Sequence, residues 1–256
     1  MTSEVDEAFS KTLLGSYDDD EPWEAVALLQ RIGTREVFDR AAGWCLSENP
    51  RQRAVGFDVL AQLGRTVEHP RNNYPDESFS LVSRLVQAET NMQPLCSALY
   101  ALGHIGNPLG IQLLVERQSH ADSNVRFAVA FALGNFADNP RSTAALLSLM
   151  EDADATVRDW ATFGLGVLGS LDSAQIRDAL LRRSVDADTD VRQEALIGLG
   201  KRKDRRALSA LQKELSKPEV PSRIVEAADA FLGERNSDIE RTPVEYIAEL
   251  NKRYSI

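Results

Sequence analysis

The chain is poor in the residues that build most metal sites and disulfide frameworks. Its 256 residues include only two cysteines, Cys45 and Cys96. Both lie in apolar helical patterns, so we expect reduced, buried thiols. The three histidines, His69, His104 and His120, are far apart, and neither His-x-x-x-His nor Cys-x-x-Cys occurs. We therefore expect no metal and no cofactor.

An excess of positive charge is also missing. Lys and Arg number 29 against 39 Asp and Glu, a formal net charge of −10, which disfavours nucleic acid and anionic membrane surfaces as partners. No apolar run is long enough to span a bilayer, and the first residues lack the basic and apolar regions of a secretory signal. These absences predict a cytoplasmic protein with no membrane partner.

What the sequence does contain is an internal repeat. The pair Val-Arg, with Leu-Gly seven and eight residues after the arginine, occurs at Arg126, Arg158 and Arg192. With these arginines as position zero, the same frame extends to four further zero positions. They are Pro22, Arg53, Leu95 and Arg223. The spacing runs from 31 residues (22 to 53) to 42 residues (53 to 95).

Each repeat contains two helical patterns. The first is short and amphipathic, and the second, after position zero, places apolar residues at i, i+3, i+4 and i+7. No alternating strand pattern accompanies them. The prediction is an all-α fold, a right-handed α-α superhelix (solenoid) of about seven helix pairs with capping helices. We expect residues 1–233 to form the solenoid with its N-terminal capping helix. Residues 234–256 are expected to add a linker and a C-terminal capping helix to the same domain.

Three columns of the repeat predict local contacts. A short polar residue four places before zero, such as Asp122, Asp154 or Asp188, suits a helix N-cap. Glycines eight or eleven places after zero suit left-handed C-caps. The recurring arginine is expected to pair with the aspartate column of its own or the adjacent unit, which is a structural role.

The motif Val-Arg-x-x-Ala-x-x-x-Leu-Gly-x-x-Gly, with an aspartate a few residues ahead, resembles the HEAT-repeat family in its short bacterial form. The resemblance covers about residues 22–233. It implies stacked helix pairs but little about function, because HEAT-like arrays serve as scaffolds, adaptors, inhibitors and occasionally enzymes. The excess around residues 65–78 departs from the pattern and predicts an exposed loop.

The remaining motifs favour no catalytic site. Residues 164–169 match G-x-G-x-x-G but end a repeat helix instead of following a strand, so they predict no dinucleotide site. The acidic run at 18–21 is best interpreted as a solvated helix start, because its spacing is not that of a calcium loop. Iron-dependent hydroxylases among HEAT proteins use His-Glu pairs, which this chain lacks.

The candidate site is a set of aromatic and polar residues in the middle repeats. In HEAT-like arrays the second helices line the concave face, and positions plus one, five and nine are expected to point into the groove. The candidate protein-binding residues on this face are Tyr100, His104, Phe127, Phe131, Asn135, Trp160 and Phe163. The alternative, equally weighted, is that the rings fill the core between layers, because rotating a helix by one position decides it.

The sequence favours a non-enzymatic protein–protein interaction module that binds a protein or peptide in this groove, as an adaptor, scaffold or inhibitor (immunity-type) partner. The acidic charge suits a basic partner, and we expect a monomer. The alternative is a HEAT-like enzyme, such as a bilin-attaching lyase or a DNA glycosylase. Asp159-Trp160 superficially fits a glycosylase, but the groove lacks the basic residues that hold phosphates.

Overall fold

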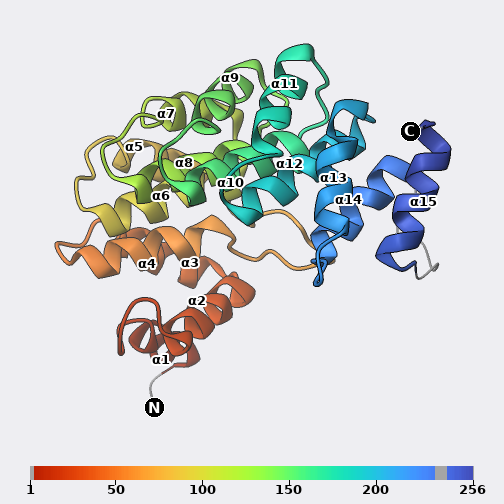
Figure 1. The fold of residues 1–256 in the computed structure, drawn as a ribbon. Coiled ribbons are helices and arrows are strands. Elements are labelled where there is room, and N and C mark those ends of the chain that lie inside the picture. The colour runs from red at the N-terminus through yellow and green to blue at the C-terminus, as the bar shows by residue number, and fades with distance from the viewer. Residues whose placement is uncertain (1–2, 234–240, 256) are drawn as a thin grey trace. The chain divides into compact units, whose positions relative to one another are not determined.

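The computed structural model describes residues 3–233 and 241–255, and over these ranges the chain is helical, without a strand (Figure 1). The predicted all-α solenoid class is confirmed. Two compact units make up the chain, Met1–Asn135 and Phe136–Ile256, and each is described by itself. The predicted linker, 234–241, lies outside the described residues except for its last position.

Unit 1 contains four stacked helix pairs. Its second helices pack side by side in chain order, and each first helix packs on the second helix of its own pair. The first helices are α1 (Glu4–Lys11), α3 (Arg35–Trp44), α5 (Pro75–Leu85) and the short η1 (Pro108–Gly110) with α7 (Ile111–Val115). The second helices are α2 (Asp20–Ile32), α4 (Pro50–Ala61), α6 (Met92–Ile105) and α8 (Ser123–Gly134).

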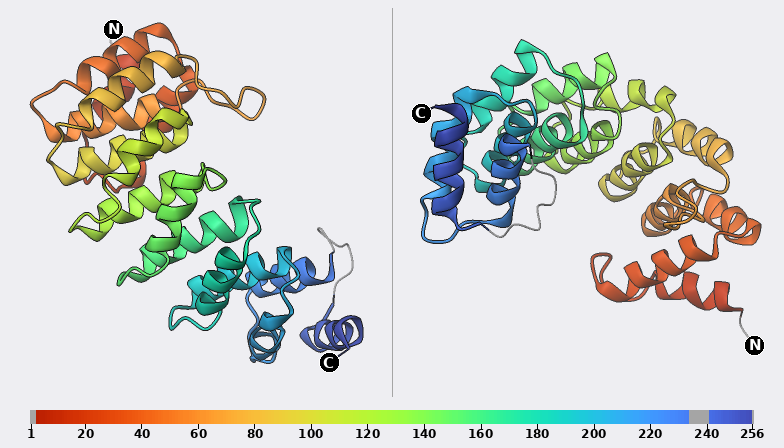
Figure 2. Two further views of the ribbon diagram at one scale, coloured as in Figure 1. Left: turned by 90° about the horizontal axis from the view of Figure 1, so that it is seen from above. Right: turned by 90° about the vertical axis from the view of Figure 1, so that its right-hand side faces the viewer.

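Unit 2 repeats the arrangement and adds a capping helix (Figure 2). Its first helices are α9 (Pro140–Leu149), α11 (Ala174–Arg183) and η3 (Arg205–Ala207) with α13 (Leu208–Leu215). Its second helices are α10 (Ala155–Phe163), extended by the π-helical turn η2 (Gly164–Leu168), then α12 (Thr189–Lys201) and α14 (Ser222–Leu232). The last helix, α15 (Pro243–Tyr254), packs on α13 and α14 through Tyr246, Leu250 and Tyr254, and its capping box is formed by Thr242 and Glu245.

The polar column four places before zero supplies N-caps in the middle repeats. Asp122, Asp154 and Asp188 each accept hydrogen bonds from backbone N–H groups of the following helix turn, as predicted. The N-cap prediction is wrong near the two ends of the chain, where the N-cap residues are Asp19 and Pro221. The degenerate repeats have kept the helices but shifted where they begin.

The repeating arginine does pair with the adjacent repeat, but through a different acidic column. Arg158 donates through Nη2 and Nε to Asp186 at 2.8 and 3.0 Å, and through Nη1 to the carbonyl of Asp152 at 2.9 Å. Arg53 pairs in the same way with Glu89 at 2.7 and 3.0 Å. Asp186 and Glu89 lie six residues before the next zero position, not four. The predicted column is wrong: the arginines pair with the carboxylates two residues before the N-cap, which also accept from the backbone N–H of the N-cap residue.

We expect Arg158→Ala to lower the free energy of unfolding by about 1–3 kcal/mol, because the buried Asp186 loses two charge-assisted hydrogen bonds and the carbonyls of Asp152 and Ala153 lose this donor. Asp186 keeps only its hydrogen bonds from Arg183 and from the backbone N–H of Asp188. The Asp186 side chain is only 5% exposed. Chemical denaturation measures the change. Arg182→Ala is the control, because the Arg182 side chain, which pairs with Glu151, is 57% exposed. Equal midpoints for the two variants would contradict the structural role of Arg158.

The glycine columns divide into two roles. Gly33 and Gly106, eleven places after zero, end their helices with φ of 56° and 75°, so the C-cap prediction is confirmed there. The glycines eight places after zero are not caps. A Cβ atom on Gly103 would lie 2.7 Å from the Cα atom of Ala132, so this glycine lets α6 and α8 approach each other closely.

The long connection between α4 and α5 is only partly the predicted exposed loop. Residues 66–71 are exposed, as expected. Asn72 is buried and donates to the carbonyl of Leu60 at 2.7 Å, and the ring of Tyr74 packs on Phe38 with centroids 5.0 Å apart. The prediction of an exposed loop is therefore wrong for the residues just before α5.

Candidate protein-binding surfaces

Four ring side chains meet on the second-helix layer of unit 1. Tyr100 and His104 come from α6, and Phe127 and Phe131 come from α8. Tyr100 makes edge contacts with Phe131 and Phe127, with centroids 5.3 and 6.0 Å apart, and His104 lies 5.2 Å from Phe131. We call these four residues the α6–α8 aromatic cluster. All four are half-buried.

The register of each helix explains why the cluster is neither core nor free surface. On α6, Leu99 and Leu102 are fully buried, one position away from Tyr100 and two from His104. On α8, Leu133 is fully buried, two positions after Phe131. Because a helix turns by 100° per residue, the rings lie at the boundary between packed face and solvent. Asn135, at the end of α8, is exposed.

Partial burial also changes the ionisation of the cluster. Burial, with the charge of the nearby Arg65, lowers the pKa of His104 below its ordinary value, so the ring is neutral near pH 7. Burial raises the pKa of Tyr100 well above the usual range. The cluster therefore presents neutral rings with two polar edges, which suits apolar contact better than charge recognition.

In unit 2 the remaining predicted aromatics, Trp160 and Phe163, lie together on α10. Their centroids are 5.6 Å apart, and both rings are half-buried. The guanidinium of Arg223, from α14, lies 5.9 Å from the Phe163 centroid and also binds both carboxylate oxygens of Glu194. This pairing brings an aromatic ring, a cation and an anion together on one surface of the unit.

Asp159, beside Trp160, is an acidic group that the sequence analysis did not place in the site. Burial, together with the charges of Glu194 and Asp190, raises its pKa to about 7. Its Oδ1 atom is buried and has no hydrogen-bond donor within the described part of the chain. The second-helix surface of unit 2 is thus more acidic than the α6–α8 aromatic cluster of unit 1.

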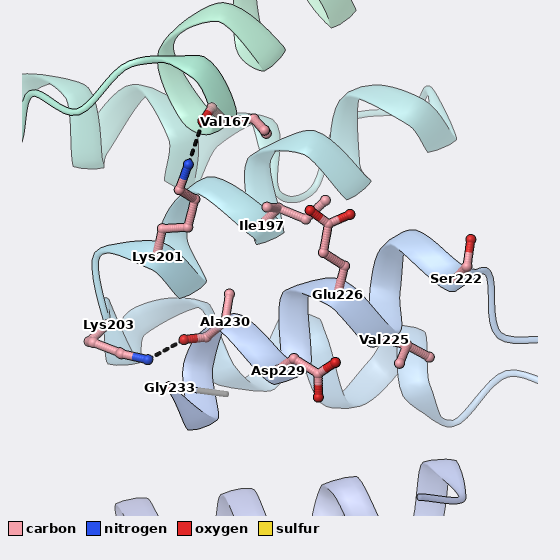
Figure 3. A pocket seen from close by; sticks show the side chains of 10 residues that line it. All are labelled: Val167, Ile197, Lys201, Lys203, Ser222, Val225, Glu226, Asp229, Ala230 and Gly233. Carbon is pink, nitrogen blue, oxygen red and sulfur yellow. Dashed lines mark hydrogen bonds between the residues drawn. The ribbon is translucent and has the colours of Figure 1, made fainter. Parts of the chain in front are cut away.

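Unit 2 also contains a pocket of about 760 Å³ between α12 and α14 (Figure 3). The side chains drawn along it are Val167, Ile197, Lys201, Lys203, Ser222, Val225, Glu226, Asp229, Ala230 and Gly233. We call it the α12–α14 pocket. None of these residues was predicted to belong to the site, because each taken alone has the pattern of a core or solvated helix position.

Comparison with known proteins agrees with the repeat fold. Residues 80–166 match the protein-family model for HEAT repeats. This segment carries HEAT repeats. The matched HEAT segment contains all seven residues of the predicted site, and the resemblance inferred from the sequence is confirmed.

The whole chain is similar to Protein YibA of Escherichia coli K12, with 28% identity over 208 residues, covering 78% of this chain and 71% of YibA. An X-ray structure of Escherichia coli YibA matches 98% of this chain and 93% of its own, with a TM-score of 0.71 and 25% identity. The complex of CpcE and CpcF of phycocyanin lyase from Nostoc sp. PCC7120 matches 98% and 95%, with a TM-score of 0.50. With 16% identity, this likeness shows the fold alone.

Within residues 3–233 and 241–255, no three His, Cys, Asp or Glu side chains come together in a group that could hold a metal ion. Over the same residues, none of the helices combines the length and apolar character that a membrane span requires.

Proposed function

We propose that this HEAT-repeat chain is a non-enzymatic protein-binding module whose α6–α8 aromatic cluster contacts a protein or peptide segment. The observation that carries the proposal is the partial exposure of four mutually contacting rings on adjacent second helices. The packing of the repeats does not require aromatic rings at these positions. The position on α12 that corresponds to Tyr100 and Phe131 holds Ile197, which is 1% exposed.

General properties of solenoids support the same function. Stacked repeats offer an extended surface of second helices, and many such proteins bind partners there. Aromatic side chains held in place by their neighbours are frequent hot spots, because they bury a large area on binding and lose little conformational entropy. Trp160 and Phe163 would form a separate contact surface in unit 2. An adaptor, scaffold or inhibitor in the cytoplasm, acting as a monomer, fits this proposal.

The enzymatic alternatives gain no support. The likeness to phycocyanin lyase shows the fold alone. A DNA glycosylase would need a run of basic side chains along the second helices, whereas Asp159, Glu194, Glu226 and Asp229 lie along those of unit 2.

The proposal predicts a selective effect of Phe131→Ala on binding. Random peptides displayed on phage are selected on the full chain, and the enriched sequences are synthesised and titrated by calorimetry. We expect Phe131→Ala to weaken their binding by about 1 kcal/mol or more, because it removes the ring that contacts both Tyr100 and His104. Thermal denaturation of the same variant reports how much of the change comes from stability.

Leu109→Ala is the matched control, because this apolar side chain is 75% exposed in the same unit but lies on η1, outside the second-helix layer. It should leave peptide binding unchanged. Failure to enrich any peptide, or equal binding by the Phe131→Ala and Leu109→Ala proteins, would reject the α6–α8 aromatic cluster as the binding surface.

A further inference from the structure

We infer that the α12–α14 pocket receives a lysine or arginine side chain of a protein partner. This inference rests on the proposed function, and it names the chemistry of the partner at a second place on the chain. It concerns unit 2 alone and uses none of the residues of the α6–α8 aromatic cluster.

The pocket walls suit a side chain with an apolar stem and a charged end. Val225 and Ala230, which are half-buried on α14, supply the apolar wall, and the almost fully buried Ile197 of α12 lies behind it (Figure 3). Glu226 and Asp229 are three residues apart on α14, so they lie on one face of that helix. Lysine and arginine bury three or four methylene groups against apolar surface while their charged ends reach polar partners.

The two carboxylates retain acceptor capacity. Glu226 accepts from Arg223 through Oε2 at 2.7 Å, and Asp229 accepts from the hydroxyl of Tyr246 through Oδ1 at 2.8 Å. Within the described residues, no donor is found for the other oxygen of either group. A carboxylate can accept several hydrogen bonds, so an incoming ammonium or guanidinium group could be bound by both side chains.

The lysines of the pocket are held at its other end. Lys203 donates to the carbonyls of Phe231, at 3.0 Å, and Ala230, and Lys201 donates to the carbonyl of Val167 (Figure 3). These carbonyls belong to the last turns of α14 and η2, where helix ends attract cations. The two ammonium groups would repel an entering cation and direct it toward Glu226 and Asp229.

Charge elsewhere on the unit favours the same occupant. Asp190 is an exposed carboxylate at the start of α12, and the whole chain carries a net charge of −10. A basic segment would be attracted to this surface before it docks, whereas an acidic segment would be repelled. The occupant is therefore a basic side chain, and an acidic one is the competing outcome.

The test uses three fluorescein-labelled Gly-Ser peptides that differ only at their two central positions, which hold Lys, norleucine or Glu. Fluorescence anisotropy with the full chain measures binding. We expect the Lys peptide to bind about tenfold more tightly than either of the others. Norleucine keeps the apolar stem without the charge, so it separates the two contributions. Added salt should reduce the preference for Lys.

The double variant Glu226→Gln/Asp229→Asn should abolish the preference for Lys. Its amides still accept from Arg223 and Tyr246, so the fold contacts are preserved. Asp178→Asn is the matched control, because this carboxylate is 53% exposed on α11, in the layer of first helices. It should keep the preference.

Three outcomes overturn the inference: equal binding of the Lys and norleucine peptides, tighter binding of the Glu peptide, or an unchanged preference in the double variant. Phage-selected peptides that still bind through Phe131 would then show that only the pocket assignment has failed. Loss of binding by those peptides as well would reject the proposed function itself.

Discussion

Replacing Arg202 by Met is expected to lower the free energy of unfolding by about 3–5 kcal/mol, because several buried carbonyl groups lose their donor together. Arg202 is 8% exposed. Its guanidinium donates to the carbonyls of Leu171, Leu165 and Gly198 at 2.7, 2.8 and 3.0 Å, with Gly166 at 3.1 Å. Methionine retains much of the apolar stem, so the loss reports mainly on the hydrogen bonds.

The backbone around Arg202 explains why so many carbonyls need one side chain. Helix α10 ends in the π-helical turn η2, where the N–H of Gly169 donates to the carbonyl of Gly164 at 2.8 Å. The turn leaves Leu165 and Gly166 with carbonyls that no later helical N–H can satisfy. Arg202 binds both, although burial lowers its pKa from the ordinary value.

Urea denaturation followed by circular dichroism measures this change. Arg205→Met is the control, because Arg205 is exposed and its guanidinium lies 5.2 Å from the centroid of the Tyr254 ring instead of among carbonyls. It should change the free energy by less than about 1 kcal/mol. If the urea midpoint of Arg202→Met equalled that of the control, water would replace the guanidinium as the donor to the carbonyls at η2 without loss of stability.

The architecture was predictable because it depends on periodicity. Zero positions such as Arg126 and Arg158 placed the second helices correctly, since apolar residues at helical spacing and polar N-caps such as Asp154 recur together. The π-helical turn and the role of Arg202 were not predictable. They depend on which carbonyls remain unpaired after α10, η2 and α12 have packed, and no local pattern encodes that result.

The candidate site was predictable only in part, for a geometric reason. Column membership selected Tyr100 and Phe131, but the periodicity could not distinguish core from surface, and the structure places both rings at the boundary. The α12–α14 pocket was missed because its lining combines residues from 167 to 233, on three different helices. In sequence, Glu226 and Asp229 look like ordinary solvated helix positions. Only the packing of α12 against α14 brings them beside an apolar wall.

Asp58→Asn is expected to remove a pH dependence of stability that the wild-type chain shows between 3.8 and about 7. Asp58, on α4, is 6% exposed and accepts hydrogen bonds from the hydroxyls of Tyr17 and Ser97. Burial outweighs those bonds and raises its pKa from 3.8 to about 7. The titratable groups that face it are Tyr17, Tyr100 and Cys45, and burial raises the pKa of each above its ordinary value.

The sign of the effect follows from proton binding. Between 3.8 and about 7 the folded chain holds a proton on Asp58 that the unfolded chain has released. The contribution of Asp58 to the free energy of unfolding is therefore largest below pH 3.8, and it is lost as the pH rises through about 7. The loss has a slope of up to about 1.4 kcal/mol per pH unit. In the Asp58→Asn variant the side-chain amide carries no titrating proton but still accepts from Tyr17, so the stability of that variant should fall less steeply over this interval. Asp159, whose pKa is also raised to about 7, still contributes to the slope in both proteins.

Urea denaturation of both proteins across this pH range gives the difference directly. The free energy of unfolding of the Asp58→Asn chain should rise relative to that of the wild type as the pH rises. Above the folded pKa of Asp58, the difference between the two proteins should stay constant. Asp39→Asn, an exposed carboxylate on α3, controls for the loss of one negative charge. Parallel curves for the wild-type and Asp58→Asn proteins would mean that Asp58 stays ionised in the folded chain. The hydroxyls of Tyr17 and Ser97 would then outweigh burial in setting its pKa.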